Sequence, residues 1–471
     1  MRIFKTKNIT VFRIAGYGSG NLGFGLISQM LSSYLVFYAT VILRMPGSLI
    51  GLIISISVIW DAVSDPLMGY ISDNTHSRFG RRHIYILLGT VFASISNIIL
   101  WNVSPDLSMF HKFSWILTSV LMVKTFMTVF VTPYTALGAE LSSDYNERTT
   151  IQTIKTLFFL FAILINTAGF MFIIFRSTPD WPMGQLNPQS YKYAALTASI
   201  IMLFSGLITY TSTKEFIPIL AKSKSGANVF SSTQFVKKIK FNLSEKDYRA
   251  VFFGFLFTNM ASAIITTIGL HTFTYSFYLD SRQIGVIFGV QFLVCILAQP
   301  IWAKIAERID KKNAIQLGLK ISILGCLILF ALVMFKAQVR LNYLLLLSYA
   351  IVTGFGSSGL FSIPYSMIAD TVDQQEYKTS ERNEGVYYGM LTFGYKISQS
   401  ITIFIFGIVL DLIKFDPSLT IQKNSTATML GVFLSLGSIT VFTLAALAYS
   451  KYNLDRQTVQ LMQDEINEFS E

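Results

Sequence analysis

The amino-acid sequence predicts an all-α membrane protein whose twelve transmembrane helices form two six-helix bundles. Of the 471 residues, 52% are hydrophobic and 13% are charged, which is about half the charged share of a typical soluble domain. Apolar runs recur along the whole chain, and a run of about 20 residues crosses the bilayer core as a helix. The longest polar interval, residues 213–248, separates six runs from six.

The predicted spans follow one another with short polar connections. They lie near residues 11–43, 47–72, 84–103, 112–140, 150–176, 190–212, 249–279, 283–307, 313–335, 341–369, 384–413 and 427–450. They divide the chain into a first bundle (1–212), a cytoplasmic linker (213–248), a second bundle (249–450) and a cytoplasmic tail (451–471). The basic N-terminus has no short apolar region followed by a cleavage site, so we expect a retained first helix rather than a signal peptide.

The distribution of basic residues predicts the orientation. If the N-terminus lies inside, the inner segments and helix ends hold 24 of the 37 Lys and Arg, and the outer ones hold 9. By the positive-inside rule both termini are then cytoplasmic, in a bacterial-type plasma (inner) membrane. Orientation alone accounts for the net charge of +11, so no nucleic-acid partner is expected. The partners expected are membrane lipid and a small molecule, and a monomer is sufficient.

Four lysines fall inside predicted spans, where charge is costly and marks functional candidates. They are Lys124, Lys155, Lys320 and Lys396. Lys320 lies near the inner end of its helix, where its ammonium can reach the membrane surface. The two cysteines lie within apolar runs and predict core packing rather than a disulfide or metal site.

The two halves of the chain echo each other. The fourth span ends in "PYTALGAELSSDYNERT" (133–149) and the tenth in "PYSMIADTVDQQEYKTSER" (364–382), each with Pro-Tyr before a charged turn. The second and eighth spans each carry a proline before acidic and basic residues. Repeats of this kind are typical of transporters, whose site lies near the membrane midplane.

The second span contains two aspartates one helical turn apart, Asp61 and Asp65, in "WDAVSDPLMGYISD" (60–73). Two carboxylates at the membrane centre stay ionised only beside a cation. Ser64 and the carbonyl freed by Pro66 add oxygen atoms of the kind that Na⁺ prefers. The pattern predicts a reversible site for Na⁺ or H⁺; a structural ion pair between helices is the alternative.

Basic residues follow directly in "HSRFGRRH" (76–83). On a cytoplasmic loop, Arg78, Arg81 and Arg82 can neutralise helix carbonyls and Asp73, and so latch the inner end of the bundle. Charges that only set the orientation are the alternative. An enzyme is not expected, because no CxxC, HExxH or phosphate-binding glycine loop occurs.

Together, "WDAVSDPLMGYISD…RFGRR", "PYTALGAELSSDYNERT" and "ADTVDQQEYKTSERNEGVYYGMLTFGYKI" resemble the glycoside-pentoside-hexuronide:cation symporters of the major facilitator superfamily. The resemblance runs from "GYGSGNLG" (16–23) to Lys396 and so covers most of the chain. It implies a major facilitator fold and an alternating-access importer of a glycoside driven by Na⁺, Li⁺ or H⁺. No other cofactor is implied.

The resemblance implies a cation site made of Asp61, Ser64, Asp65 and Thr128, with Asp61 and Asp65 as the Na⁺ ligands if coupling is to sodium. Lys396 matches the family's lysine of the eleventh span, which the resemblance places at both the cation site and the sugar site, and Thr392, one turn before it, also matches and is expected at the sugar site. Lys124 lies one turn before Thr128, and some proton-coupled members carry a lysine in this helix. An ammonium that reaches Asp61 favours H⁺ coupling; Na⁺ coupling stays open if Lys124 faces elsewhere.

The chain departs from the family at the sugar. Galactoside-transporting members hold their sugar with carboxylates and an aromatic ring at positions that are Gly25, Val131 and Thr135 here. The nearest counterpart of the family's sugar-contacting arginine is Lys155. A pocket that loses acids and keeps Lys155 and Lys396 favours an acidic sugar such as a hexuronide. A lipid or other organic-solute transporter of the same fold is the alternative.

Further candidates complete the predicted sites. Polar residues expected to contact the sugar are Asn21, Thr135, Asn259, His271 and Tyr275, although helix–helix hydrogen bonding is an equal alternative for each. The predicted cytoplasmic gate is a salt-bridge network of Asp73, Arg78, Arg81, Arg82, Asp144, Glu147, Arg148, Asp373, Glu376 and Arg382.

Overall fold

A computed structural model describes residues 10–75, 77–142, 145–220, 242–379 and 384–470. The chain separates into two compact units, unit 1 from Met1 to Phe230 and unit 2 from Ser231 to Glu471. Both are built from helices joined by turns and loops, and no strand occurs among their described residues. The prediction of an all-α protein is therefore confirmed for this part of the chain.

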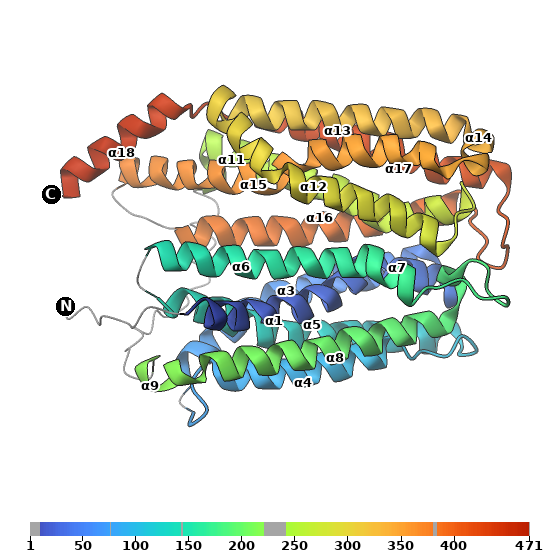
Figure 1. The fold of residues 1–471 in the computed structure, drawn as a ribbon, viewed down its shortest axis with the longest axis horizontal. Helices are drawn as coiled ribbons and strands as arrows, with labels where there is room; N and C mark the ends of the chain where they lie inside the picture. The colour runs from blue at the N-terminus through green and yellow to red at the C-terminus, as the bar shows by residue number, and fades with distance from the viewer. Residues whose placement is uncertain (1–9, 76, 143–144, 221–241, 380–383, 471) are drawn as a thin grey trace. The chain divides into compact units, whose positions relative to one another are not determined.

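Unit 1 is built from long helices that run side by side (Figure 1). Its helices are α1 (Val11–Ser33), α2 (Leu35–Phe37), α3 (Gly47–Asn74), α4 (His83–Leu100), α5 (Met109–Glu140), α6 (Tyr145–Leu164), α7 (Phe170–Ile173), α8 (Pro188–Thr213) and α9 (Ile217–Leu220). A bend of 43° separates α1 from the segment Leu35–Ile42. π-Helical turns continue α2 over Tyr38–Ile42 and join α6 to α7 over Ile165–Gly169.

Unit 2 is also built from long helices. Its helices are α11 (Lys246–Tyr275), α12 (Ser281–Ile309), α13 (Lys311–Met334), α14 (Lys336–Leu341), α15 (Leu346–Thr379), α16 (Glu384–Leu412), α17 (Asn424–Tyr449) and α18 (Arg456–Ser470). α12 begins with a capping box in which Asp280 and Gln283 satisfy each other's backbone amides, the arrangement that stabilises helix starts.

The two units share one packing pattern. In unit 1 the main helix contacts are α1 with α6 and α8, α4 with α5 and α8, and α3 with α5. In unit 2 they are α11 with α16 and α17, α13 with α15 and α17, and α12 with α15. If the six long helices of each unit are numbered in chain order, the same five pairs are in contact. The internal repeat suggested by the sequence motifs therefore extends to tertiary structure.

Glycines let the third and fourth long helices of each unit approach closely. A Cβ on Gly89 of α4 would lie 2.6 Å from the backbone nitrogen of Phe130 in α5. The equivalent pair in unit 2 is similar, because a Cβ on Gly356 of α15 would lie 2.6 Å from the backbone nitrogen of Ser322 in α13. Small residues at such crossings are typical of membrane helix bundles.

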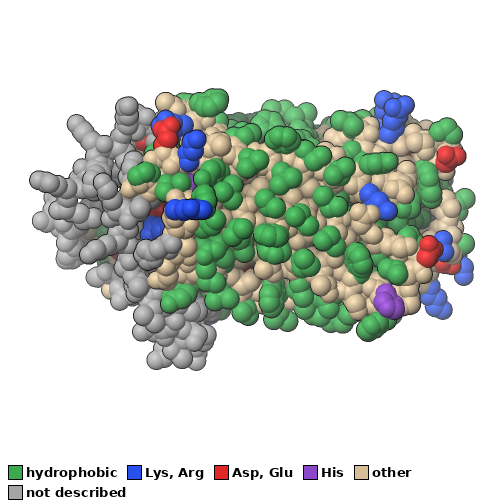
Figure 2. All heavy atoms as spheres, turned by 90° about the horizontal axis from the view of Figure 1, so that it is seen from below, with side chains coloured by type: hydrophobic (Ala, Val, Ile, Leu, Met, Phe, Trp, Pro, Cys, Tyr) green, Lys and Arg blue, Asp and Glu red, His purple; other side chains and the backbone are tan. Residues whose placement is uncertain are grey.

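Length and composition allow these helices to cross a membrane. Eleven described helices are long and apolar enough to do so, and the bent pair of α1 and Leu35–Ile42 gives a twelfth crossing if it is one span. Figure 2 shows hydrophobic side chains spread across the middle of one face, with most charged side chains toward its ends. Exposed apolar residues of α4 and α8 include Phe92, Ile95, Ile200 and Phe204.

The structure corrects one predicted boundary and shows a helix in the tail. The tenth span was predicted to end at residue 369, whereas α15 continues to Thr379. Asp373 and Glu376 therefore lie on the final turns of a helix and not in a charged turn. The predicted tail, residues 451–471, contains α18, which buries Val459 and Met462 against unit 2.

Candidate cation and substrate site

Two polar contacts, one helical turn apart, join α3 to α5 in unit 1. The ammonium of Lys124 lies 3.0 Å from Oδ2 of Asp61, and the hydroxyl of Thr128 donates to Oδ1 of Asp65 at 2.7 Å. Asp61 is 1% exposed and Thr128 is 4% exposed. One partner of each contact is therefore buried within the unit, whereas Lys124 and Asp65 are half-buried.

Helix geometry explains why these four side chains meet. Asp61 and Asp65 are four residues apart on α3, as are Lys124 and Thr128 on α5. Residues at this spacing lie on one face of a helix about 6 Å apart along its axis. Because the two helices pack together, each residue of one pair meets its counterpart of the other.

The charges of this cluster leave room for one monovalent cation. Two carboxylates and one ammonium give a formal charge of −1, which a proton or one Na⁺ would neutralise. Ser64, between the aspartates, has a buried Oγ without a hydrogen-bond partner in the structure, so it can serve as an added oxygen donor atom. No group of three or more His, Cys, Asp or Glu side chains is placed for a metal ion among the described residues.

A second polar group lies around Lys155 of α6. Its ammonium donates to Oγ1 of Thr135 at 3.3 Å and lies 5.4 Å from the ring centre of Tyr134. The amide of Asn21 in α1 donates to the backbone oxygen of Lys155 at 3.0 Å. No ion pair of Lys155 with an acidic side chain occurs within the described residues. Lys155 and Thr135 therefore form a cationic, hydrogen-bonding pair.

Tyr134 is held in place by a reciprocal contact with α1. The hydroxyl of Tyr17 donates to the backbone oxygen of Tyr134, and that of Tyr134 donates to the backbone oxygen of Tyr17, each at 3.0 Å. Their rings stack 4.6 Å apart. This pair was not predicted from the sequence, where its signal is the Pro-Tyr motif that contains Tyr134.

The candidates of unit 2 lie in different surroundings. Thr392 is exposed and bonds the backbone oxygen of Tyr388, while Lys396 one turn later is half-buried. Asn259 donates to the backbone of its own helix at 2.8 Å. His271 is fully buried against the ring of Phe406, 5.1 Å away. Tyr275 is also buried, against Phe415.

The predicted cytoplasmic end of unit 1 contains a compact cluster of ion pairs. Arg82 contacts Glu140 at 2.7 Å and Asp73 at 3.1 Å, and Arg81 also pairs with Glu140. Burial lowers the pKa of Arg82, and the two carboxylates oppose that shift. The cluster links α3, α4 and α5, yet its member Glu140 was absent from the predicted gate. The signal for it was its place within the Pro-Tyr motif, residues 133–149.

The other gate candidates form other contacts or lie outside the described residues. Arg78 stacks on Phe79 at 4.9 Å, Glu147 accepts from Ser142 at 2.5 Å, and Asp373 accepts from Gln463 at 2.7 Å. Glu376 is half-buried on α15. Asp144, Arg382 and the side chain of Arg148 lie outside the described part of the chain.

Known proteins resemble this chain over almost all of its length. An uncharacterized symporter of Bacillus subtilis (strain 168), YnaJ, is 26% identical over 98% of this chain and 95% of its own. The sodium-dependent lysophosphatidylcholine symporter 1 of Xenopus tropicalis is 24% identical over 94% and 87%. The isoprimeverose transporter of Lactiplantibacillus pentosus is 25% identical over 83% and 77%.

A solved structure shares the fold. A bacterial homologue of the human lysosomal transporter Spinster superposes with a TM-score of 0.65 over 96% of this chain and 98% of its own, at 11% identity. The family model described as MFS/sugar transport protein matches residues 16–456. A match of that extent covers the long helices of both units except the first residues of α1, so this chain is a multi-pass membrane protein that belongs to the MFS/sugar transport family.

Proposed function

We propose that the protein is a proton-coupled symporter that imports an acidic glycoside by alternating access. The observation that carries the coupling is the contact of Lys124 with Asp61, one turn from that of Thr128 with Asp65. The cluster keeps a formal charge of −1, and a neutral cluster costs far less than a charged one within the membrane interior. One bound cation per cycle is therefore favoured.

The position of Lys124 supports a proton over Na⁺. A sodium ion needs several oxygen ligands at close range, but Oδ2 of Asp61 already faces an ammonium at 3.0 Å. That positive charge repels a metal ion next to it. A proton needs a single oxygen, and Asp65 offers one while Asp61 stays paired with Lys124. In this cycle Asp65 carries the proton, and Thr128 orients its carboxyl group.

The substrate class rests on Lys155. Its ammonium bonds a hydroxyl, and no described acidic side chain forms an ion pair with it. Charge-assisted hydrogen bonds to a carboxylate are roughly twice as strong as neutral ones. A hexuronide offers both a carboxylate for Lys155 and hydroxyls for Thr135. The resemblance to an isoprimeverose transporter is consistent with a glycoside.

Uptake into proteoliposomes tests the proposal. We expect an inward proton gradient to drive accumulation of a glucuronide, with little dependence on Na⁺ at fixed pH. Asp65→Asn should abolish accumulation but retain exchange of internal for external solute. Lys155→Gln should raise the KM for a glucuronide and leave that for the neutral glucoside unchanged. Uptake that rises steeply with Na⁺ at fixed pH would contradict proton coupling.

A lysolipid is the second candidate, because relatives are lysophosphatidylcholine symporters. The same vesicles can be tested with a fluorescent lysophosphatidylcholine. Transport of that lipid without transport of any glycoside would replace the sugar assignment and leave the coupling scheme intact. Accumulation by the Asp61→Asn/Asp65→Asn double variant would refute the coupling scheme itself.

A further inference from the structure

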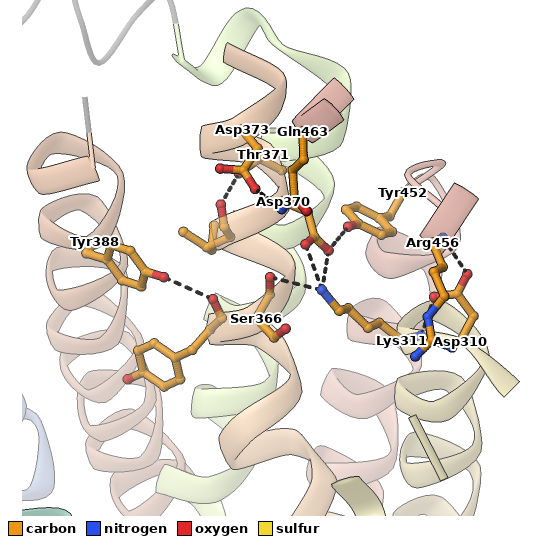
Figure 3. Close-up of polar contacts among 12 residues, drawn as sticks. Asp310, Lys311, Ser366, Asp370, Thr371, Asp373, Tyr388, Tyr452, Arg456 and Gln463 are labelled. Carbon is orange, nitrogen blue, oxygen red and sulfur yellow. Dashed lines mark hydrogen bonds and ion pairs between the residues drawn. The ribbon is translucent and has the colours of Figure 1, made fainter. Parts of the chain in front are cut away.

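The segment after the last long helix of unit 2 contacts four aspartates that belong to different parts of the unit. We call residues 452–463 the C-terminal strap. Its partners are Asp247 at the start of α11, Asp310 between α12 and α13, and Asp370 and Asp373 near the end of α15. Figure 3 shows three of these contacts, those to Asp310, Asp370 and Asp373.

Asp370 is the centre of this group. Both of its carboxylate oxygens lie 2.7 Å from the ammonium of Lys311, and Oδ2 also accepts from the hydroxyl of Tyr452 at 2.8 Å. Asp370 is 5% exposed and Tyr452 is fully buried. Burial and the neighbouring Asp370 raise the pKa of Tyr452, so its hydroxyl stays protonated and remains a donor.

Two backbone amides of the strap extend the attachment. The amide of Asn453 donates to Asp247 at 2.7 Å, and Gln374 of α15 donates to the other oxygen of the same carboxylate at 3.2 Å. The amide of Arg456 donates to Asp310 at 3.3 Å. Asp310 has a φ of 71°, a costly conformation for a residue other than glycine, which persists where surrounding contacts determine it.

Helix α18 adds an apolar contact and a fourth polar one. Val459 and Met462 are 9% and 7% exposed, and α18 packs against α15. Gln463, one residue after Met462, donates to Asp373 at 2.7 Å. The opposite face of the helix is in solvent, since Leu461 is 64% exposed. The strap therefore binds through one face, as a docked amphipathic helix does.

We propose that the C-terminal strap ties the predicted cytoplasmic ends of α11, α12, α13 and α15 into one block, and that transport at full rate requires it to be docked. Alternating access moves bundles largely as rigid bodies. If the helix ends of one bundle can separate, the helices bend individually and the bundle no longer moves as one rigid body. Loops connect each of these four helices only to the next one along the chain. The strap contacts the ends of all four.

Hydrogen exchange measured by mass spectrometry tests the docking, independently of any transported solute. Deletion of residues 452–471 should speed amide exchange in residues 305–315 and 366–379 by about tenfold or more, because these helix ends open locally more often. Deletion of residues 467–471 keeps all four contacts and is the matched control. If exchange in the two deletions is the same, the strap does not brace unit 2.

A gentler pair of variants guards against misfolding. Tyr452→Phe combined with Gln463→Ala removes two side-chain donors, whereas Gln460→Ala on the exposed face of α18 removes none. We expect faster exchange at the end of α15 only in the first. An unchanged rate there would overturn the proposal even if the deletion protein cannot be purified.

The effect on rate depends on the proposed transport function, and the docking does not. Initial uptake should fall several-fold in the Tyr452→Phe/Gln463→Ala protein and stay at the wild-type level in Gln460→Ala. Equal uptake by the two, together with the expected exchange difference, would overturn the requirement for docking. If the wild-type protein transports none of the solutes tested but the variants still differ in amide exchange, the proposed transport function is refuted and the docking of the strap is supported.

Discussion

Removal of the Lys124 ammonium is expected to destabilise unit 1 and to make its thermal stability depend on Na⁺. In the structure this ammonium is the partner of Asp61, a carboxylate that is 1% exposed. Removing one partner of a buried pair leaves an uncompensated charge and costs about 3–5 kcal/mol. For a unit of this size that loss lowers the apparent Tm by on the order of 10 °C.

A double variant measures the interaction between Lys124 and Asp61 separately from the contacts that each makes with other residues. Lys124→Met and Asp61→Asn should each lower the Tm, whereas the combined variant should recover at least half of the sum, because no lone charge is left. A double-mutant cycle reports this as a coupling free energy of about 2 kcal/mol or more. Thermal unfolding in detergent, followed by tryptophan fluorescence, measures it. If the two single losses add in the double variant, the pair contributes nothing as a pair.

Sodium provides the second half of the assay. Without Lys124 the cluster has two carboxylates and a formal charge of −2, together with the oxygens of Ser64 and Thr128. We expect NaCl, but not choline chloride, to raise the Tm of Lys124→Met by several degrees, as a ligand that binds only the folded state does. The wild-type Tm should respond equally to both salts. A sodium-specific rise in the wild-type protein would refute the view that Lys124 excludes the metal ion.

Three further predictions concern single contacts. Thr128→Val should weaken proton-driven uptake and lower the free energy of unfolding by about 1.5–3 kcal/mol, the contribution of a hydrogen bond to a charged group. Thr128→Ser should retain wild-type uptake and stability, and the measurement is the initial rate of uptake as a function of pH. Gly89→Ala should lower the Tm and the purified yield, because its Cβ would meet the backbone of α5 at 2.6 Å, while Gly389→Ala, with nothing within 4 Å, should be neutral. Arg82→Lys should lower the Tm by a few degrees, since an ammonium cannot replace a guanidinium that contacts two carboxylates; an unchanged Tm would show that the cluster adds no stability.

Much of the fold was predictable because hydropathy alone locates long membrane helices. The predicted span 47–72 and the observed α3, Gly47–Asn74, differ by two residues. The error at α15 is instructive. Its last ten residues include Asp370 and Asp373, and their low hydropathy predicts a loop. They form a helix because their carboxylates are buried against Lys311, Tyr452 and Gln463, partners that are distant in sequence.

The candidate site was also predictable only where the contacts follow from helical spacing. Helical spacing alone placed Lys124 one turn before Thr128, and the structure brings both to the aspartates of α3. Helical spacing does not distinguish a polar residue that lines a transport pathway from one that packs inside a bundle. His271 and Tyr275 lie among aromatic rings, and only the neighbouring helices of unit 2 decide that.

The repeated packing of the two units makes their differences informative. The same five helix pairs are in contact in each, yet their predicted cytoplasmic ends are joined by different means. In unit 1 the residues before α4 supply two arginines to Glu140 at the end of α5. In unit 2 the residue that begins α13 supplies a single lysine to Asp370 of α15. One ammonium replaces two guanidinium groups, so the attachment within this pair of helices is weaker in unit 2. The hydroxyl of Tyr452 lies where a further donor to Asp370 is needed. The strap thus strengthens the unit in which the ion pair is weaker, and a protein with Lys311 replaced by Arg should depend less on its strap than the wild type does.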